Sequence, residues 1–539
     1  MKNNSAFTLI ELLAVIVILA IIALIATPLI LDVISEARKG AFQNSAYGIV
    51  EAGEMGFAKD MLKGTEGEVT FTYTDGVEQS SVLGKQLDYK GTKPRSGTVV
   101  VNSSGQVAIA IHDGTYCAEK TYEENVVSIS SKSAEDCNLE GGTETPIVTG
   151  EPNEPNILDG MIGITWNGTN WVKADTSDQW YDYDNKQWAN AVLLTDAARS
   201  AYINADAGYT ITEADVLAYL VWIPRYRYKL FNATFQVSSP QEIEIEFQNR
   251  TTPKSNGNSN GEWLTHPAFT FGADELDGIW VGKFEISAPT TSDCYTNTQS
   301  LYCNDPSIMP RIKPGVKPLH LASAGTHFSI IQNLNDTFYG LEANTDAHMM
   351  KNTEWGAVAY LSHSIYGRNN QVSINAFLDS WSATGGGHGN AYITNVSQST
   401  TGNVYGIYDM SGGQDEYVMG AMYNSNNTTV NTALSGFSSA VIDAPNFSKY
   451  IDKYTYGTTT TDQTAYDRSI LGDATGETRG WYSDYQNFVY PSSNRAWFGR
   501  GGNIINGSSA GQFAFRAEDA SAAYASTGSS RAVIPGFGQ

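Results

Sequence analysis

Residues 7–30 read FTLIELLAVIVILAIIALIATPLI, an almost wholly apolar stretch that follows the short polar segment MKNNSA at residues 1–6. The stretch is long enough to cross a bilayer as a helix. One charged residue, Glu11, lies inside it, and a carboxylate in such surroundings is costly unless a cation pairs with it. Pro28 removes one helical hydrogen bond, which predicts a kink or a local break near the end of the stretch.

A secretory signal peptide or a plain membrane anchor is the simpler interpretation of this segment. Three features argue against it. A charge lies inside the apolar run, no small-residue A-x-A cleavage site follows the run, and the polar leader directly precedes FTLIELL. This arrangement resembles the class III leader of type IV prepilins and of type II secretion pseudopilins.

The resemblance implies that a prepilin peptidase cuts between Ala6 and Phe7 and that the new N-terminus is methylated. The family usually has Gly before the cut, so Ala6 predicts slower processing. Glu11 would then pair with the N-terminal amine of a neighbouring pilin subunit. The resemblance places the precursor in the cytoplasmic (inner) membrane and the assembled protein in an extracellular pilus or on the cell surface.

Beyond Leu29 the helical pattern continues as an amphipathic segment. Its apolar residues recur at three- and four-residue steps and mark one packing face: Ile30, Ile34, Ala37 and Ala41. The combined pattern predicts a helix from Phe7 to about Leu62, roughly 80 Å long at 1.5 Å per residue. Three glycines weaken its far half: Gly48, Gly53 and Gly56.

Residues 67–130 read as short strands joined by turns. The segment GEVTFTYTDG alternates and ends at an Asp-Gly hairpin signal, and SGTVVVNSSGQVAIAIHDG gives two strands around a Ser-Gly turn. We therefore expect an α+β domain at residues 31–140, in which a long N-terminal helix packs on a small antiparallel sheet. This is the pilin architecture that the leader implies.

The cysteines fall into two local pairs, Cys117 with Cys137 and Cys294 with Cys303. They show neither a C-x-x-C motif nor the spacing of a zinc site. In an exported chain we expect two disulfides, while reduced and buried cysteines are the alternative. A bridge in the first pair would stabilise its short loop by about 3 kcal/mol on the chain-entropy model.

Residues 141–156 predict an exposed linker, because they are rich in Gly, Thr, Glu and Pro and show no periodicity. The chain then continues through residues 157–539, and its length of 539 residues favours two or more domains. Residues 157–215, with the patches WNGTNW and WYDYDNKQW, form either a small subdomain or the first strands of the same fold. Helices are expected at 211–223, 324–334 and 349–367, the last capped by Thr353.

The formal net charge is −24, from 57 acidic and 33 basic residues. Such a surface repels phosphate backbones, so we do not expect nucleic acid as a ligand. It tolerates divalent cations, calcium in particular.

Four segments of the C-terminal part occur in the order in which a known family has similar ones: LDGIWVGKFEIS (276–287), NTEWGAVAY (352–360), NVYGIYDMSGGQDEY (403–417), and RGGN followed by FAFR and SRAV (500–533). They resemble the formylglycine-generating enzyme (sulfatase-modifying factor) family, whose fold is C-type-lectin-like. The resemblance implies a loop-rich C-type-lectin-like α+β domain at residues 157–539.

The chain departs from that family at its chemistry. The enzymes use two cysteines after R-G-G to bind copper, whereas residues 504–516 (IINGSSAGQFAFR) contain none. Without thiolates there is no soft ligand set and no nucleophile, so we expect neither copper nor the family's catalysis. The family also binds a structural calcium ion, which implies a site at Gly413, Asp415 and Glu416. The alternative is that the two acids are solvated in a loop.

The combination favours a minor or tip pilin-like surface protein that displays a non-catalytic lectin-like domain for adhesion or ligand binding. The ligand would be an unknown surface glycan or protein. Five residues after R-G-G form the expected contact surface, unless they simply fill the closing strands: Asn503, Asn506, Ser508, Ser509 and Gln512. A pseudopilin of a secretion or competence system, or an enzyme of the sulfatase-modifying family with altered chemistry, stays open as an alternative.

Overall fold

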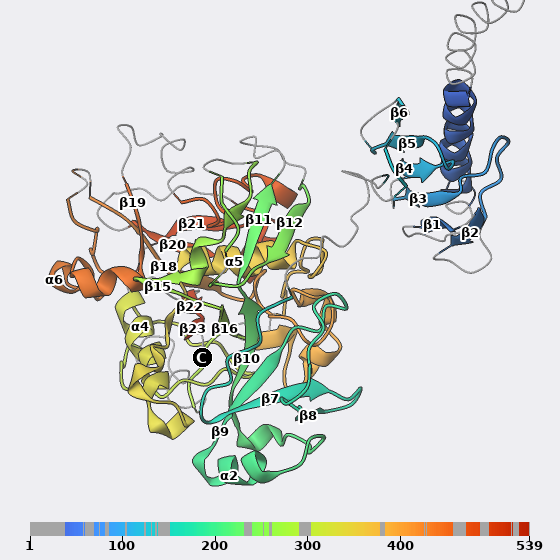
Figure 1. Cartoon of the computed structure of the whole chain (residues 1–539). Coiled ribbons are helices and arrows are strands. Elements are labelled where there is room, and N and C mark those ends of the chain that lie inside the picture. Colours follow the sequence, from blue (N-terminus) through green and yellow to red (C-terminus); the bar gives the residue numbers. More distant parts are fainter. Residues whose placement is uncertain are drawn as a thin grey trace, which may run out of the picture. The chain divides into compact units, whose positions relative to one another are not determined.

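The computed structural model describes two compact units of the chain, Met1–Val148 and Thr149–Gln539 (Figure 1). In the first unit the described residues are 38–57, 59, 69–74, 76–80, 86–102, 105–122, 126–130, 132–134 and 137. In the second they are 151–230, 240–251, 253–257, 261–289, 303–377, 383–424, 426, 428–455, 470–485, 495–518, 520 and 528–537. The expected leader and apolar helix, with Ala6, Phe7, Glu11 and Pro28, lie outside these ranges.

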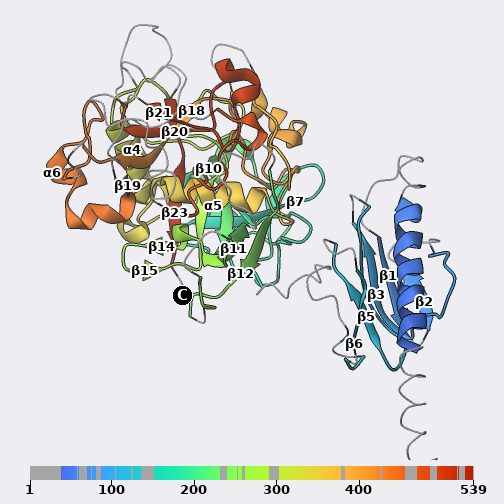
Figure 2. The ribbon, with the colours of Figure 1, turned by 90° about the horizontal axis from the view of Figure 1, so that it is seen from above.

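The N-terminal unit is a helix packed on an antiparallel sheet, as the sequence predicts (Figure 2). The helix occupies residues 38–57, and the described strands pair in the order β2-β1-β3-β4-β5-β6. Their bounds are β1 Val69–Thr74, β2 Val77–Ser80, β3 Ser96–Val101, β4 Val107–His112, β5 Cys117–Lys120 and β6 Ser128–Ser130. Both predicted hairpins are confirmed, with left-handed glycines at the turns (Gly76, φ 80°; Gly105, φ 83°).

The helix presents Phe42, Ala46, Ile49 and Gly53 to the sheet, at three- and four-residue steps. Ala41, which belongs to the expected packing face, is exposed, while the other members of that face, Ile30, Ile34 and Ala37, lie outside the described residues. Gly53 allows the helix to come close to the sheet, since a Cβ there would lie 2.9 Å from a Val107 methyl group. A disulfide joins Cys117 to Cys137, which confirms the first predicted bridge.

The C-terminal unit is built on a mixed set of helices and largely antiparallel sheets. Over the described residues its main sheet has the order β17-β23-β16-β10-β9-β7-β8, with antiparallel pairing throughout. These strands are β7 Met161–Trp166, β8 Trp171–Lys173, β9 Asn190–Leu194, β10 Val216–Pro224, β16 Gly278–Gly282, β17 His348–Met349 and β23 Ala532–Gly536. Residues 157–215 thus supply strands of the main sheet, in line with the second interpretation above.

The remaining strands form smaller sheets. The largest of them has the described order β19-β18-β20-β21, with β22 also paired to β18. Its strands are β18 Asp415–Met422, β19 Asp452–Tyr454, β20 Trp497–Arg500, β21 Phe515–Glu518 and β22 Gly528–Ser530. The others are β11 Tyr226–Leu230, β12 Ile243–Phe247, β13 Leu264–Thr265, β14 Thr270–Phe271 and β15 Asp274–Glu275. The described α-helices of this unit are α2 Asp196–Asn204, α4 Ala324–Gln332, α5 Asn352–Ser362 and α6 Ser439–Ile442.

The helix expected at 211–223 is wrong. After a short 3-10 turn at Glu213–Asp215, the chain enters β10, in which all nine residues are buried. A central strand that is covered on both faces has a continuous apolar sequence. Hydrophobic periodicity cannot distinguish such a sequence from that of a buried helix.

The helices expected at 324–334 and 349–367 are confirmed as the shorter α4 and α5. Every residue of α5 is buried, and the helix packs against β10, β12 and β18. Lys351, and not Thr353, occupies its N-cap position, where the Lys351 backbone N–H donates to Glu354 Oε2 at 2.8 Å. Among the described residues, no helix combines the length and apolarity needed to cross a membrane.

Residues 151–156, which we expected to belong to the linker, contact the C-terminal unit. The Asn153 carbonyl accepts a hydrogen bond from the Trp222 indole at 3.0 Å, and the Asn156 carbonyl accepts one from the Trp280 indole at 2.7 Å. Asn153 and Asn156, in the last part of the expected linker at 141–156, therefore belong to the packed C-terminal unit.

Candidate functional site

The R-G-G segment forms the turn that leads from β20 to the expected contact surface. Gly501 (φ 79°) and Gly502 (φ 65°) both have left-handed backbone conformations, which residues other than glycine rarely adopt. A Cβ on Gly501 would lie 3.3 Å from the ring of Trp355 in α5. The short 3-10 segment Ile504–Ser509 follows, and the chain then returns as β21.

Two of the five predicted contact residues point inward. Asn503 and Gln512 are 4% and 1% exposed. The Asn503 amide donates to Asp415 Oδ2 at 2.5 Å. The Gln512 backbone carbonyl accepts from the Trp355 indole at 2.8 Å, and its side-chain oxygen accepts from the Ser362 hydroxyl at 3.0 Å. These contacts hold the turn against α5 and β18, and neither side chain is exposed at the surface.

The other three predicted residues lie at the tip of the same segment. Ser508 is exposed, while Asn506 and Ser509 are half-buried. Asn506 Oδ1 accepts from the Asn503 backbone N–H at 2.7 Å, which fixes the tip. The Ser509 carbonyl accepts from the Tyr485 backbone N–H at 2.7 Å, and Tyr485 itself is 41% exposed. We call Tyr485 and residues 506–509 the loop tip.

Tyr485 was missed by the sequence reasoning. It follows the segment GWYSD at 480–484. The signal that could have identified it is an aromatic residue next to polar residues in an expected loop. Beneath it, Asp484 Oδ2 accepts from the Phe513 backbone N–H at 3.0 Å, and burial raises the pKa of Asp484 to about 7. The loop tip therefore combines hydroxyl, amide and aromatic groups on a backbone held from below.

The residues expected to hold calcium lie in the turn before β18 and at the start of that strand. Asp415 and Glu416 begin β18 and are 2% and 0% exposed, so they are not solvated loop acids. Asp415 pairs with Arg516, and Glu416 pairs with Arg531, whose Nε lies 3.0 Å from Glu416 Oε2. Within the described ranges, no group of three or more His, Cys, Asp or Glu side chains is arranged to hold a metal ion. The structure thus brings Gly413, Asp415 and Glu416 together as a turn and two ion pairs.

Arg531 is the centre of a buried ionic cluster. Its Nη1 donates to the Gly282 carbonyl at 2.7 Å, and its Nη2 donates to the Tyr408 carbonyl at 2.9 Å. Burial raises the pKa of Asp409 to about 6 and that of Glu416 to about 7, and the Arg531 charge opposes both shifts. Burial, together with the charges of Asp409 and Glu416, raises the pKa of Glu285 well above its ordinary value. These side chains are inaccessible, which indicates a structural role.

Cys303 is buried and disulfide-bonded, while its predicted partner Cys294 lies outside the described residues. Among the residues that the structure describes, no cysteine is free. The described part of the C-terminal unit therefore offers no thiolate for redox chemistry or nucleophilic attack.

The N-terminal segment matches a known family model. Residues 1–27 match the family model described as the prokaryotic N-terminal methylation motif. The chain therefore has a type IV pilin-like N-terminus with a prepilin-type leader. No curated protein matches the chain.

Proposed function

We propose that this chain is a minor or tip subunit of the type IV pilin class, which displays its C-terminal unit outside the cell for adhesion or ligand binding. The observation that carries the proposal is the N-terminal methylation motif at residues 1–27. Processing after Ala6 would expose Phe7, and the apolar helix would then hold the subunit in the membrane or in a filament. Other pilin subunits and a prepilin peptidase are its partners.

The N-terminal unit supports this proposal independently of the motif. Its helix packs on an antiparallel sheet, and Cys117 is bridged to Cys137 at the C-terminal end of that sheet. Disulfides persist in oxidising compartments, which fits a domain that is exported. The large unit at Thr149–Gln539 favours a minor or tip position, because each copy in a regular filament would have to accommodate its bulk.

The C-terminal unit is proposed to be a C-type-lectin-like binding domain without catalysis. The four segments that resemble the sulfatase-modifying family contact one another. Arg531 bonds to Gly282 and Glu416, and Arg500 donates to Asn352 Oδ1 at 2.7 Å. Segments far apart in sequence thus share one ionic and hydrogen-bonded core, while residues 504–516 lack the cysteines of the enzymes. A retained scaffold without reactive thiols favours recognition.

Processing is tested by producing the full chain in a bacterium that has a prepilin peptidase and measuring the mature N-terminus by mass spectrometry. We expect a chain that begins at Phe7, and the uncut precursor in a strain without the peptidase. A retained Met1 in both strains, or a cut beyond Pro28, would contradict the proposal.

Binding is tested at the loop tip with the full chain displayed on cells. Ser508→Trp should weaken attachment to host-cell glycans or proteins, because the exposed hydroxyl is replaced by a bulky ring. Ser200→Trp, an exposed position on α2, is the matched control and should attach normally. Equal attachment by the two variants would remove the loop tip from the binding surface.

A further inference from the structure

Residues 151–157 enter the C-terminal unit as a strap that two asparagines hold in place. The Asn153 amide donates to the carbonyls of Gln248 at 3.1 Å and Asp277 at 2.9 Å. The Asn156 amide donates to the Phe537 carbonyl at 2.6 Å. With the two indole bonds described above, the strap is tied to segments that are far apart in sequence. Its side chains are therefore fixed before any ligand arrives.

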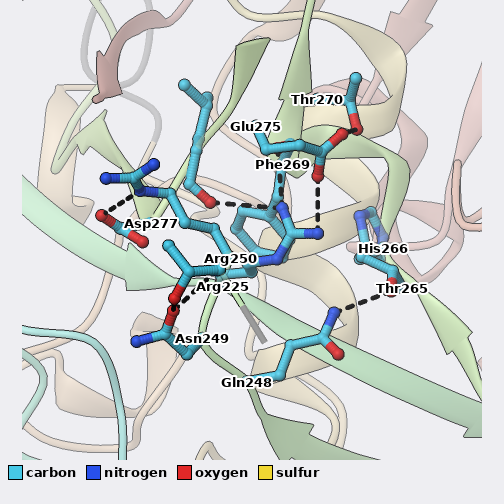
Figure 3. A network of polar contacts seen from close by, with 12 residues as sticks. Arg225, Gln248, Asn249, Arg250, Thr265, His266, Phe269, Thr270, Glu275 and Asp277 are labelled. Atoms are coloured by element: carbon cyan, nitrogen blue, oxygen red, sulfur yellow. Dashed lines mark hydrogen bonds and ion pairs between the residues drawn. The ribbon is translucent and has the colours of Figure 1, made fainter. Parts of the chain in front are cut away.

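The neighbouring side chains are fixed by a polar network (Figure 3). Arg250 Nε lies 2.9 Å from Asp277 Oδ2, and the two residues face each other at one side of the view. Asn249, which follows β12, accepts from the Thr251 backbone N–H at 2.8 Å. Beside them Arg225 pairs with Glu275 at 2.6 Å. One side-chain oxygen of each residue is thus engaged: Asn249 Oδ1 by Thr251 and Asp277 Oδ2 by Arg250.

A pocket of about 260 Å³ lies between the strap and this network. Its walls include Asn153, Glu154, Asn156, Asn249, Asp277 and Phe537. Hydrogen bonds from other described residues do not reach Asn153 Oδ1, Asn156 Oδ1 or Asp277 Oδ1. The exposed carboxylate of Glu154 is a further acceptor, and the amide nitrogen of the exposed Asn249 can act as a donor. The pocket therefore offers mainly acceptors.

The chemistry of these walls selects the ligand. Acceptors require a ligand that donates, such as a polyol or an amine. The lining also includes two apolar residues, Pro155 and Phe537, which can meet the C–H groups of a sugar ring. Asp277 is paired with Arg250, whereas no cation among the described residues pairs with Glu154, so an anionic ligand is disfavoured. The volume lies just below the roughly 300–1,000 Å³ of sites for drug-sized molecules, which suits a ligand of one small ring.

We propose that this pocket binds a single neutral or amino-bearing sugar unit, such as the terminal residue of a glycan. The inference deepens the binding role proposed above, at a site separate from the loop tip. It does not depend on prepilin processing, because binding is measured on the purified chain whether or not that chain is cut or assembled.

The test uses the full chain in detergent, titrated with methyl glycosides of glucose, galactose, mannose and N-acetylglucosamine, and with glucosamine, by calorimetry and saturation-transfer NMR. We expect at least one sugar to bind in the millimolar range or tighter. Asn249→Trp, at an exposed position, should fill the pocket and weaken binding at least about tenfold with an unchanged Tm, while Ser200→Trp should bind normally. Glu154→Gln should weaken glucosamine binding and leave the neutral sugar unaffected.

Three outcomes would overturn the proposal. They are the absence of binding by every sugar, wild-type affinity in Asn249→Trp, and stronger binding of inorganic phosphate or of an N-acetyl-lysine amide than of any sugar. The last two probes distinguish an anion site, and a pocket for a basic side chain of a protein partner, from a sugar site.

Discussion

Arg531 is fully buried, and its guanidinium bonds to Glu416 and to the carbonyls of Gly282 and Tyr408. It directly precedes β23, the closing strand of the main sheet. One cation thus joins β16, β18 and the C-terminal end of the fold. A buried ion pair of this kind is costly to break, because the carboxylates that remain lose their counter-charge.

Arg531→Met should therefore lower the free energy of unfolding of the C-terminal unit by about 3–5 kcal/mol. The measurement is denaturant unfolding followed by tryptophan fluorescence. The control is Arg495→Met, which removes a cation at an exposed position and should cost less than about 1 kcal/mol. Equal losses in the two variants would contradict the central role of Arg531.

Glu477 lies in a second buried polar group, where it accepts hydrogen bonds from the hydroxyls of Tyr228 (3.2 Å) and Tyr360 (2.9 Å). Burial raises its pKa to about 7, so the folded state binds a proton more tightly than the unfolded chain does. That contribution to stability is present at low pH and is lost as the pH rises through about 7. Burial acts oppositely on His266 and His327 and lowers the pKa of each to about 3, so the wild-type curve sums opposing effects.

A difference between variants isolates the carboxyl group. Glu477→Gln should gain stability relative to the wild type as the pH rises from about 4.5 to 8, by at most about 3 kcal/mol. Urea unfolding of both proteins at several pH values measures this difference. A difference that stays constant, or that shrinks with pH, would contradict the raised pKa.

The polar residues between positions 503 and 512 show that the sequence alone does not separate buried side chains from exposed ones. Asn503 and Ser508 are equally plausible contacts in the sequence, yet Asn503 bonds to Asp415 while Ser508 faces solvent. The amide of Asn503 bonds to Asp415, which lies 88 residues away in the sequence, and no local sequence pattern predicts such a pair. Side-chain roles of this kind depend on tertiary contacts, which is why the exposed part of the site had to come from the structure.

At the scale of elements, the sequence predicts those features that depend on neighbouring residues, such as hairpin turns and amphipathic helices. The hairpins around Gly76 and Gly105 were predicted from turn chemistry. The position of α5 was predicted from apolar spacing, although its cap was not. The strand β10 was mistaken for a helix, because a strand buried on both faces has no alternation to reveal it. The segments that resembled a known family meet in one core, which their sequences alone did not show.

Two glycines of the N-terminal helix, Gly53 and Gly56, allow the effect of close packing to be compared with the effect of helix propensity. Gly53→Ala should destabilise the N-terminal unit by about 1–3 kcal/mol, because the new Cβ would lie 2.9 Å from Val107 Cγ2 and 3.1 Å from Val101 Cγ2. Gly56→Ala should stabilise it by up to about 1 kcal/mol, since no atom lies within 4 Å of that Cβ. Thermal unfolding of the full chain, followed by circular dichroism, should show shifts of opposite sign in the first unit. Shifts of the same sign would refute the close approach at Gly53.

At the scale of the whole molecule, the chain combines a pilin-like N-terminus with a C-terminal unit that has its own core. The two units have separate hydrophobic clusters among the described residues, so each can be perturbed without unfolding the other. Assembly and recognition are thereby assigned to different parts of the proposed subunit.

Glu11→Ala tests assembly separately from folding. Removal of a charge from the apolar stretch should leave membrane insertion intact, but assembly should fail because the partner of the neighbouring N-terminal amine is lost. Immunoblots of sheared filaments and of membranes measure the two fractions. Val15→Ala, in the same stretch, should assemble normally; normal incorporation of Glu11→Ala would count against the pairing.

The contact between Asn156 and the Phe537 carbonyl places the beginning and the end of the C-terminal unit within one hydrogen bond of each other. A unit whose ends meet can be inserted into a surface loop of a host protein without separating the host's strands. The same geometry permits circular permutation, with new ends opened elsewhere on the surface. Residues 151–537 can therefore be inserted as one unit at a single site of an unrelated host protein, because both of their ends are joined to the host at the same place.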